Sequence, residues 1–324
     1  MVTHEFTSNF AARIQGFILQ KHALGHPYGM NTLLLWQFDK MCRERFPMES
    51  RLTKDICMAW AVRKASESNN SFRRRLGPLR EFARYLNRAG ETAFVLPLDF
   101  ARKGPRYVPH IYTEAEIASI WRVADEIEQK RADSPVRHLV IPTFLRLLYC
   151  CGLRPGEARN LRLENVDLER GRLEIMESKG LKNRHVWMAD DMAERCRNYN
   201  SQVERIIPKR EVFFPNNKGQ VYGTSYIDTT FRNIRAKAGI QQAGEHPPRL
   251  YDFRHTFATH RLYQWMREGK DISAVLPYLS VYMGHSQISD THYYIHLVPG
   301  MVETMSGVDF SAFSDLLPEV ESDE

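Results

Sequence analysis

One short stretch of alternating residues constrains the fold of this 324-residue chain more than any other feature. Within residues 165–188, apolar and polar positions alternate and β-branched residues are frequent, a pattern typical of short antiparallel strands. Elsewhere the apolar residues recur mainly at helical spacing. We therefore predict a mainly α-helical fold with one small antiparallel β-sheet of three short strands.

The helical spacing falls into two groups, one on each side of residues 99–112. The first group predicts helices at residues 10–24, 32–46, 53–66 and 71–90, with Thr53 as the N-cap of the third. The second group predicts helices at about residues 114–131, 137–151, 190–206, 225–238, 252–267 and 271–283. Thr113 and Glu116 form a capping-box pattern before the first of these helices, Gly152 marks the end of the second, and Pro155 marks the start of a further helix. We expect four segments from this pattern: a helical domain at 1–98, a linker at 99–112, a second domain at 113–300 and a C-terminal tail at 301–324.

Charge is distributed unevenly along the chain. The net charge is +6, but residues 1–110 hold 18 Lys and Arg against nine Asp and Glu, so the remainder is net acidic. A basic region followed by an acidic tail predicts that the first domain binds a polyanion. The linker also carries cations and prolines, as expected of a segment that crosses a nucleic-acid backbone.

Several classes of protein are excluded by what the chain lacks. There is no run of about 18 apolar residues that would predict a membrane-spanning helix, and the N-terminal residues lack the pattern of a secretory signal. The five cysteines include no CxxC pair, and two of them, Cys150 and Cys151, lie in an apolar helical run. We expect a cytoplasmic protein with reduced, buried thiols and no membrane partner.

Four stretches of the second domain contain candidate functional residues. They are CCGLRPGEARNL with Arg154, ESKGLKNRHVWM with Lys179, RLYDFRHTFATH with Arg254, and MGHSQISDTHYYIH with His285 and Tyr294. Each stretch alone fits an ordinary surface or packing role. Together they indicate phosphoryl transfer, because arginines neutralise non-bridging oxygens and a tyrosine of pKa about 10 needs nearby cations to act as an anionic nucleophile.

The order and spacing of these residues resemble the tyrosine recombinase (phage integrase) family over about residues 113–300. The stretch around Arg154, including Glu157 three residues later, resembles the first arginine box of the family. SKGLKNR resembles its lysine hairpin, DFRHTFATH its second arginine box, and MGHSQISDTHYYIH its Gly-His box. The resemblance implies that Tyr294 is the nucleophile, because it follows His285 by nine residues and precedes His296 by two. Tyr293 fits neither spacing.

One position departs from the family pattern. The family usually has a histidine three residues before the second arginine, and this chain has Tyr251 there. His246 does not fit the spacing, and His255 matches the motif but is expected to be structural. A tyrosine hydroxyl can hydrogen-bond a phosphate oxygen but cannot act as a base near neutral pH.

The resemblance also implies a mechanism. Tyr294 would attack a DNA phosphate to form a 3′-phosphotyrosyl link and free a 5′-hydroxyl, which Lys179 would protonate. Arg154, Arg254 and His285, assisted by Tyr251, would hold the phosphate oxygens without a metal or other cofactor. A 5′-hydroxyl of a partner strand would then reverse the reaction.

The implied partners are double-stranded DNA and other copies of the chain. The first domain would correspond to the core-binding domain of the family, and four protomers would act on two DNA sites, with or without accessory recombinases. The tail would pack on a neighbouring protomer or on its own domain. Two alternatives remain open at this point: a type IB topoisomerase-like enzyme, and a DNA-binding regulator with an impaired pocket.

Overall fold

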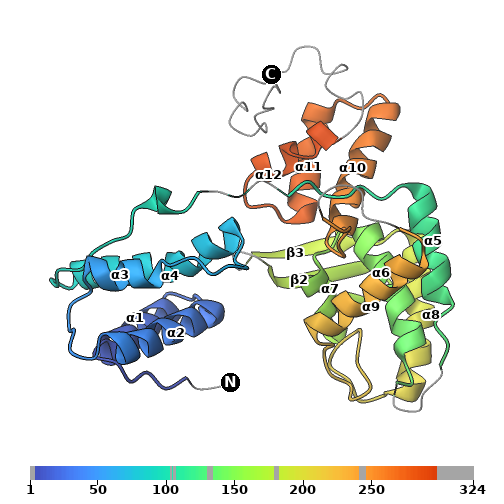
Figure 1. The fold of residues 1–324 in the computed structure, drawn as a ribbon. Helices are drawn as coiled ribbons and strands as arrows, with labels where there is room; N and C mark the ends of the chain where they lie inside the picture. Colours follow the sequence, from blue (N-terminus) through green and yellow to red (C-terminus); the bar gives the residue numbers. More distant parts are fainter. Residues whose placement is uncertain are drawn as a thin grey trace. The chain divides into compact units, whose positions relative to one another are not determined.

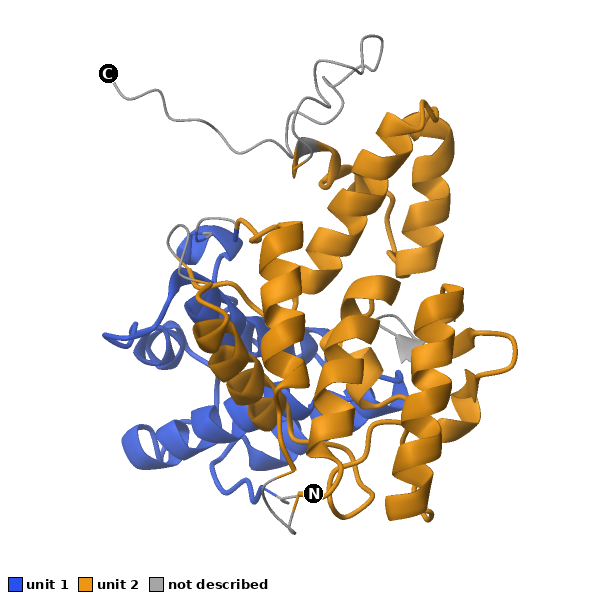
Figure 2. Cartoon of the chain, turned by 90° about the vertical axis from the view of Figure 1, so that its right-hand side faces the viewer, with its two compact units in different colours: residues 1–107 blue, residues 108–324 orange. Residues whose placement is uncertain are grey.

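The structure is a computed structural model that describes residues 4–102, 104, 107–129, 134–178, 182–240 and 246–297, without the side chains of Glu177, Ser178, Lys182 and His296. Over these residues the chain is mainly α-helical with one small antiparallel sheet, which confirms the predicted fold class (Figure 1). The chain divides into two compact units, Met1–Tyr107 and Val108–Glu324 (Figure 2). Each unit has a hydrophobic core of its own.

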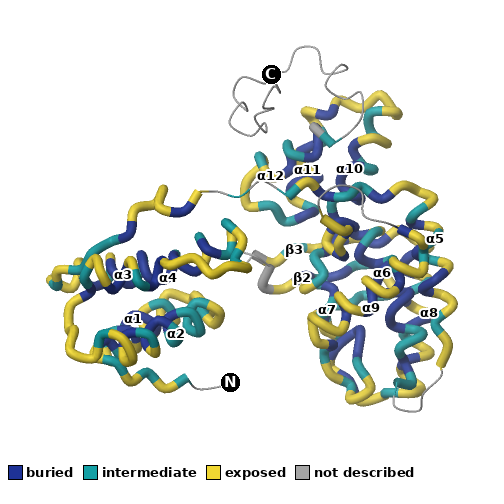
Figure 3. Tube along the Cα trace, in the orientation of Figure 1, coloured by how far each residue is buried: buried dark blue, intermediate teal, exposed yellow. Residues whose placement is uncertain are grey.

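The first unit is helical throughout its described core. Its helices are α1 (Ala11–Ala23), α2 (Gly29–Arg45), α3 (Lys54–Trp60) and α4 (Asn69–Arg88), followed by a 3₁₀ turn at Leu98–Phe100. Apolar side chains on one face of each helix form the core, with Phe10, Phe38 and Phe82 completely buried in it. Figure 3 shows these buried faces of α1, α2, α3 and α4.

The helix ends in this unit follow from specific side chains. Thr53, the predicted N-cap, accepts a hydrogen bond from the backbone N–H of Ile56 at 3.4 Å. The third predicted helix was wrong in extending to residue 66, because α3 ends at Trp60. There the guanidinium group of Arg75 donates to the carbonyl of Trp60 and, at 3.0 Å, to that of Val62. The carbonyls at the end of α3 therefore accept hydrogen bonds from Arg75 and not from the backbone N–H groups of a further helical turn.

The second unit is arranged around helix α6 (Arg137–Cys151), which packs against α5 (Glu114–Asp125), α8 (Asp190–Ile206) and α10 (Asp252–Arg267). The other helices are α7 (Pro155–Arg159), α9 (Thr224–Lys237), α11 (Ile272–Met283) and α12 (Ser289–His292), with 3₁₀ turns at Leu163–Asn165 and Ile295–Leu297. The capping box predicted for Thr113 and Glu116 is present at the start of α5. That helix ends at Asp125 and is therefore shorter than predicted.

The predicted sheet is present and its strands alternate as expected. Strands β1 (Val166–Asp167), β2 (Arg172–Ser178) and β3 (Lys182–Trp187) are antiparallel and lie in the order β1-β2-β3. Leu173 of β2 pairs with Val186 of β3, and both side chains are buried. The α11 helix packs against β3, and α7 packs against β2, so the sheet lies beside the ends of two helices that carry candidate residues.

A separate hydrophobic cluster forms near the C-terminal end of the described chain. It joins α10, α11 and the segment after α12, and it includes Phe257, Leu276, Met283 and Tyr294. The ring of the predicted nucleophile is therefore part of a packed core.

Four cysteines are buried, but Cys150 is exposed, which corrects the expectation that all the thiols are buried. Cys150 and its neighbour Cys151 occupy different faces of α6, and only Cys151 faces the core. None of the helices in the described ranges is long and apolar enough to cross a membrane.

Candidate active site

Arg154 lies where the chain passes from α6 to α7. Helix α6 ends at Gly152, which has a φ of +58°, and Pro155 occupies the first position of α7, as the sequence predicts. The guanidinium group of Arg154 donates to Oε1 of Glu157 at 2.6 Å and to the carbonyl oxygen of Gly284 at 3.1 Å. Arg154 is thus fixed to the segment that carries His285, because Gly284 is 130 residues away in sequence and directly precedes that histidine.

Glu157 binds two arginines in a nearly buried position. Its carboxylate accepts hydrogen bonds from both terminal nitrogens of Arg184, at 2.9 and 2.8 Å, as well as from Arg154. The side chains of Glu157 and Arg184 are each only 7% exposed. Burial alone would raise the pKa of Glu157, but the hydrogen bonds and positive charge of Arg184, with those of Arg154, lower it to about 2. Glu157 is therefore ionised at neutral pH.

Arg254 is fully buried on α10 and is held by backbone carbonyls. Its terminal nitrogens donate to Gly152 at 2.6 Å and to Met283 at 2.5 Å, while Nε has no hydrogen-bond partner among the described residues. Burial, followed by repulsion from Arg154, lowers the pKa of Arg254 to about 10, so the group remains charged at neutral pH. A Cβ added at Gly152 would lie 2.4 Å from the ring of Phe257, so only glycine allows this close approach of α6 and α10.

His285 follows the end of α11, where Gly284 has a φ of +66°. Its Nδ1 lies 2.7 Å from the hydroxyl of Thr291, a buried residue of α12. Burial and then the positive charges of Arg254, Arg154 and Arg184 lower the pKa of His285 to about 3. The imidazole is therefore neutral near pH 7 and can hydrogen-bond an anion without itself carrying charge.

Tyr294 lies among these groups, just after α12, and is 3% exposed. Its ring is stacked on that of His285, with centroids 6.0 Å apart and an interplanar angle of 18°. Burial raises the pKa of Tyr294, whereas Arg254 and Arg154 act in the opposite direction. The neighbouring Tyr293 packs against the hydrophobic cluster, and its ring lies 5.9 Å from that of Tyr294.

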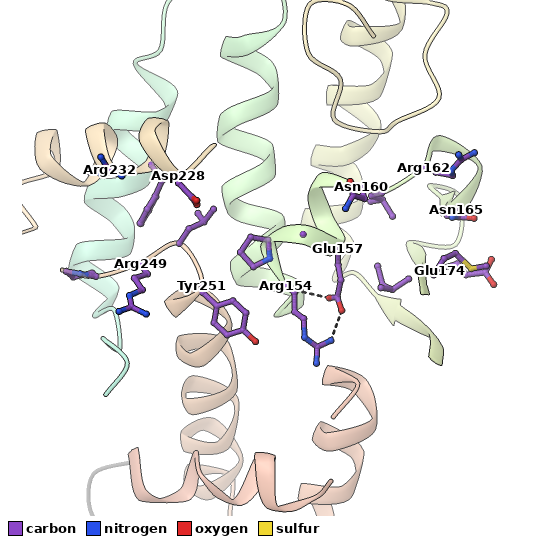
Figure 4. A pocket seen from close by; sticks show the side chains of 18 of the residues that line it. Arg154, Glu157, Asn160, Arg162, Asn165, Glu174, Asp228, Arg232, Arg249 and Tyr251 are labelled. Carbon is purple, nitrogen blue, oxygen red and sulfur yellow. Dashed lines mark hydrogen bonds and ion pairs between the residues drawn. The ribbon is translucent and has the colours of Figure 1, made fainter. Parts of the chain in front are cut away.

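Tyr251 directly precedes α10, makes no side-chain capping bond to it and is 40% exposed. It points toward Arg154 in the close view of the pocket (Figure 4). Burial alone would lower the pKa of Arg154, but Glu157 and, more weakly, Tyr251 raise it. The structure therefore brings Arg154, Arg254, Tyr251, His285 and Tyr294 together, whereas His246 is exposed.

Two residues named by the sequence motifs lie wholly or partly outside the described residues. Lys179 lies outside the described residues, between the end of β2 at Ser178 and the start of β3 at Lys182. The side chain of His296 is also outside the description. Within the described part of the chain, no group of three or more His, Cys, Asp or Glu residues is arranged to hold a metal ion.

A groove of about 1210 Å³ opens beside Arg154 and Tyr251. It is bounded by α7, β2, α9 and the segment before α10, and Figure 4 shows several of its basic side chains. These further arginines are Arg162, Arg232, Arg235 and Arg249. Acidic residues, including Glu157, Glu164, Glu174 and Asp228, also line the groove, so both signs of charge are present in it.

Two residues at the site were not predicted to have a functional role. Arg184 is the last residue of the SKGLKNR stretch, but its contact with Glu157 depends on the pairing of β2 and β3. His255 was expected to be structural, yet its ring lies between those of Tyr251 and Tyr294, at 5.2 and 5.6 Å. Its position next to Arg254 was the only signal in the sequence.

Comparisons with known proteins agree with this geometry. The sequence model of the phage integrase family matches residues 112–300. A protein of Sinorhizobium fredii named as an integrase/recombinase, y4rB, is 30% identical over 259 residues, which cover 78% of this chain and 82% of that protein. A tyrosine recombinase XerC of Lactobacillus delbrueckii is 26% identical over 288 residues, covering 83% and 89% of the two chains.

The fold is also shared with solved structures. XerH site-specific recombinase, bound to palindromic difH substrate, aligns with a TM-score of 0.62 and 18% identity over 85% of this chain and 77% of that chain. The family match covers more than half of the sequence and contains every candidate residue. The chain therefore belongs to the phage integrase family of tyrosine recombinases, enzymes that cleave and rejoin DNA at specific sites.

Proposed function

We propose that Tyr294 is the nucleophile of this recombinase and that Arg154 and Arg254 hold the scissile phosphate. The observation that supports this assignment most directly is the position of Tyr294. Its ring is stacked on His285, and the charges of Arg254 and Arg154 both act on its hydroxyl. Tyr293 is only partly buried at the edge of the same cluster, and its spacing from His285 does not fit the family pattern.

The chemistry follows from these positions. The Tyr294 oxygen bonds to phosphorus while the bond from phosphorus to the 5′-oxygen breaks, which leaves a 3′-phosphotyrosyl link. The two guanidinium groups neutralise the non-bridging oxygens, and neutral His285 and Tyr251 donate hydrogen bonds to them. Lys179 protonates the departing 5′-oxygen, because an alkoxide is a poor leaving group without an acid. Attack by another 5′-hydroxyl reverses these steps and rejoins the DNA.

Both units contribute to DNA binding in this proposal. In the second unit, the groove beside Arg154 receives the DNA backbone through Arg162, Arg232 and Arg249. In the first unit, α4 offers the exposed cations Arg74 and Arg84, whereas Arg75 and Arg80 are buried and bonded within the unit. Phosphate contacts of this kind give affinity without reading the sequence of the DNA.

We further propose that protomers assemble on paired DNA sites, four protomers to two sites. A λ integrase in the same fold class is described as a dimer bound to a core site, and XerH is described with a palindromic substrate. Strand exchange requires two duplexes in one complex, and paired protomers on each duplex meet that requirement. Residues 301–324 are proposed to pack on a neighbouring protomer or on their own domain.

A strand-transfer assay tests this function. Two labelled duplexes that carry the recognition site, taken from the DNA flanking the gene, are incubated with wild-type protein and with Tyr294→Phe. We expect wild-type protein to join strands from different duplexes and Y294F to bind both duplexes without joining them. Relaxation of supercoils without joining would favour a topoisomerase, and DNA binding without any cleavage by the wild type would favour a regulator.

A further inference from the structure

The tyrosine at position 251 leaves the site in need of another proton acceptor. A tyrosine nucleophile must lose its proton as it attacks phosphorus, and Tyr251 cannot take that proton near neutral pH. His285 is stacked on Tyr294, but its Nδ1 is engaged with the hydroxyl of Thr291 at 2.7 Å, and its Nε2–H is the donor to the phosphate in the function proposed above. Neither ring nitrogen of His285 is then left to accept the proton.

His255 lies where a proton acceptor for Tyr294 is needed. Its ring centroid is 5.6 Å from that of Tyr294 and 5.2 Å from that of Tyr251, so it sits between the proposed nucleophile and the substituted position. The titratable groups that face it are Tyr251 and Arg254 from α10, His285 from the end of α11, and Tyr294 from the segment after α12.

The ring of His255 has an unused hydrogen-bonding atom. Its Nδ1 is buried and has no partner among the described residues, whereas buried polar groups in proteins are usually hydrogen-bonded. A buried nitrogen without a partner costs free energy, so a purely structural role would favour an apolar residue at this position. Packing alone therefore does not account for a histidine here.

We propose that His255 is a catalytic residue of this enzyme and accepts the proton of Tyr294, in place of the histidine that the family usually has at position 251. This inference rests on the proposed role of Tyr294 as nucleophile. In the cleavage step, the proton moves from the Tyr294 hydroxyl to His255 as the oxygen bonds to phosphorus. In the rejoining step, His255 returns the proton to Tyr294 as the phosphotyrosyl bond breaks, so the imidazole becomes neutral again.

The charge state of His255 is compatible with this role. Burial and the neighbouring Arg254 lower the pKa of His255 to about 4, so the ring is neutral and able to accept a proton at neutral pH. A bound phosphate adds negative charge between the arginines. It therefore weakens the repulsion of an imidazolium ion and makes His255 a stronger base in the DNA complex than in the free protein.

A rescue experiment distinguishes proton transfer from packing. Single-turnover cleavage of a nicked suicide substrate is measured for wild type, Tyr251→His, His255→Asn and the double variant Y251H/H255N, at saturating protein. We expect H255N to bind DNA as the wild type does but to cleave about 10²–10⁴-fold more slowly, the usual contribution of a general base. We expect the double variant Y251H/H255N to cleave at least about tenfold faster than H255N, because Y251H returns an imidazole to the site.

The pH dependence gives a second readout. The deficit of H255N should narrow as the pH rises, because hydroxide can remove the proton of Tyr294 in place of histidine. H255Q replaces H255N in the same cycle if the asparagine variant does not fold. Cleavage by H255N within about twofold of the wild-type rate, a double variant no faster than H255N, or a deficit that is equal at every pH would each overturn the inference. Covalent adduct formation by Y294F would instead refute the proposed nucleophile.

Discussion

The carboxylate of Glu157 accepts hydrogen bonds from both terminal nitrogens of Arg184, at 2.9 and 2.8 Å, while also holding Arg154 at 2.6 Å. Arg184 additionally donates to the carbonyl oxygen of Tyr282 at 2.9 Å. These contacts connect β3, α7 and the end of α11, which carry or flank the candidate residues. Arg184 is a positioning residue, because it acts on the phosphate site through Glu157 and the Gly284 segment.

We predict that Arg184→Ala destabilises the protein and slows cleavage. Removing one partner of a buried ion pair typically costs about 3–5 kcal/mol, since the remaining charge stays buried. Arg184→Lys should recover part of the stability, because an ammonium group keeps the charge but not the paired hydrogen bonds. Thermal unfolding and single-turnover cleavage measure the two effects. Arg122→Ala is a matched control, because Arg122 forms an exposed pair with Glu126. A stability of R184A equal to that of this control would contradict the prediction.

The ion pair between Glu157 and Arg184 also predicts how the stability of the protein depends on pH. The pKa of Glu157 is about 2 in the folded protein, below the ordinary value of 4.5. The unfolded chain therefore binds the proton more tightly, and the contribution of Glu157 to stability is complete above about pH 4.5 and is lost as the pH falls toward 2. R184A should weaken this dependence. Urea unfolding of both proteins across this range measures it, and parallel curves would show that Arg184 does not set the pKa.

Tyr251→Phe should slow cleavage by less than the roughly 10²–10³-fold cost of removing a donor to an oxyanion. The reason is that Arg154, Arg254 and His285 also stabilise the negative charge on the phosphate oxygens. Tyr278→Phe serves as a control, since Tyr278 is an exposed tyrosine of α11. If Y251F cleaves as fast as the wild type, Tyr251 is a packing residue.

The exposed arginines of α4 should determine part of the salt dependence of DNA binding. Replacing Arg74 and Arg84 with glutamine should reduce the slope of log affinity against log salt by about 0.9 for each DNA phosphate that these arginines neutralise in the wild type. The control is Arg122→Gln, which removes an exposed cation of α5 outside the groove. An unchanged slope in the α4 variant would show that these two arginines neutralise no DNA phosphate.

Local sequence signals were sufficient for most of the fold. The Thr113 and Glu116 capping box, Gly152 and Pro155 each marked a helix end that the structure contains. The ends of α3 and α5 could not be predicted in the same way. The end of α3, for example, depends on Arg75, a residue 15 positions later in the sequence.

The site was predictable only in part, for a related reason. The motifs identified the residues that the structure brings together, because the family keeps their spacing. The role of Arg184 depends on its hydrogen bonds to Glu157 and Tyr282, which lie 27 and 98 positions away. The surroundings of His255 likewise depend on how the segment after α12 returns to α10. Interactions of this range leave no periodic pattern in the sequence.

Mapping the covalent adduct tests the central claim most directly. A suicide substrate traps the cleaved complex, the DNA is digested to a short remnant, and mass spectrometry of the peptides identifies the modified tyrosine. The account predicts a phosphonucleotide on Tyr294 in the wild type and in Tyr293→Phe, and no adduct in Tyr294→Phe. A remnant on Tyr293, or an adduct that persists in Y294F, would contradict it.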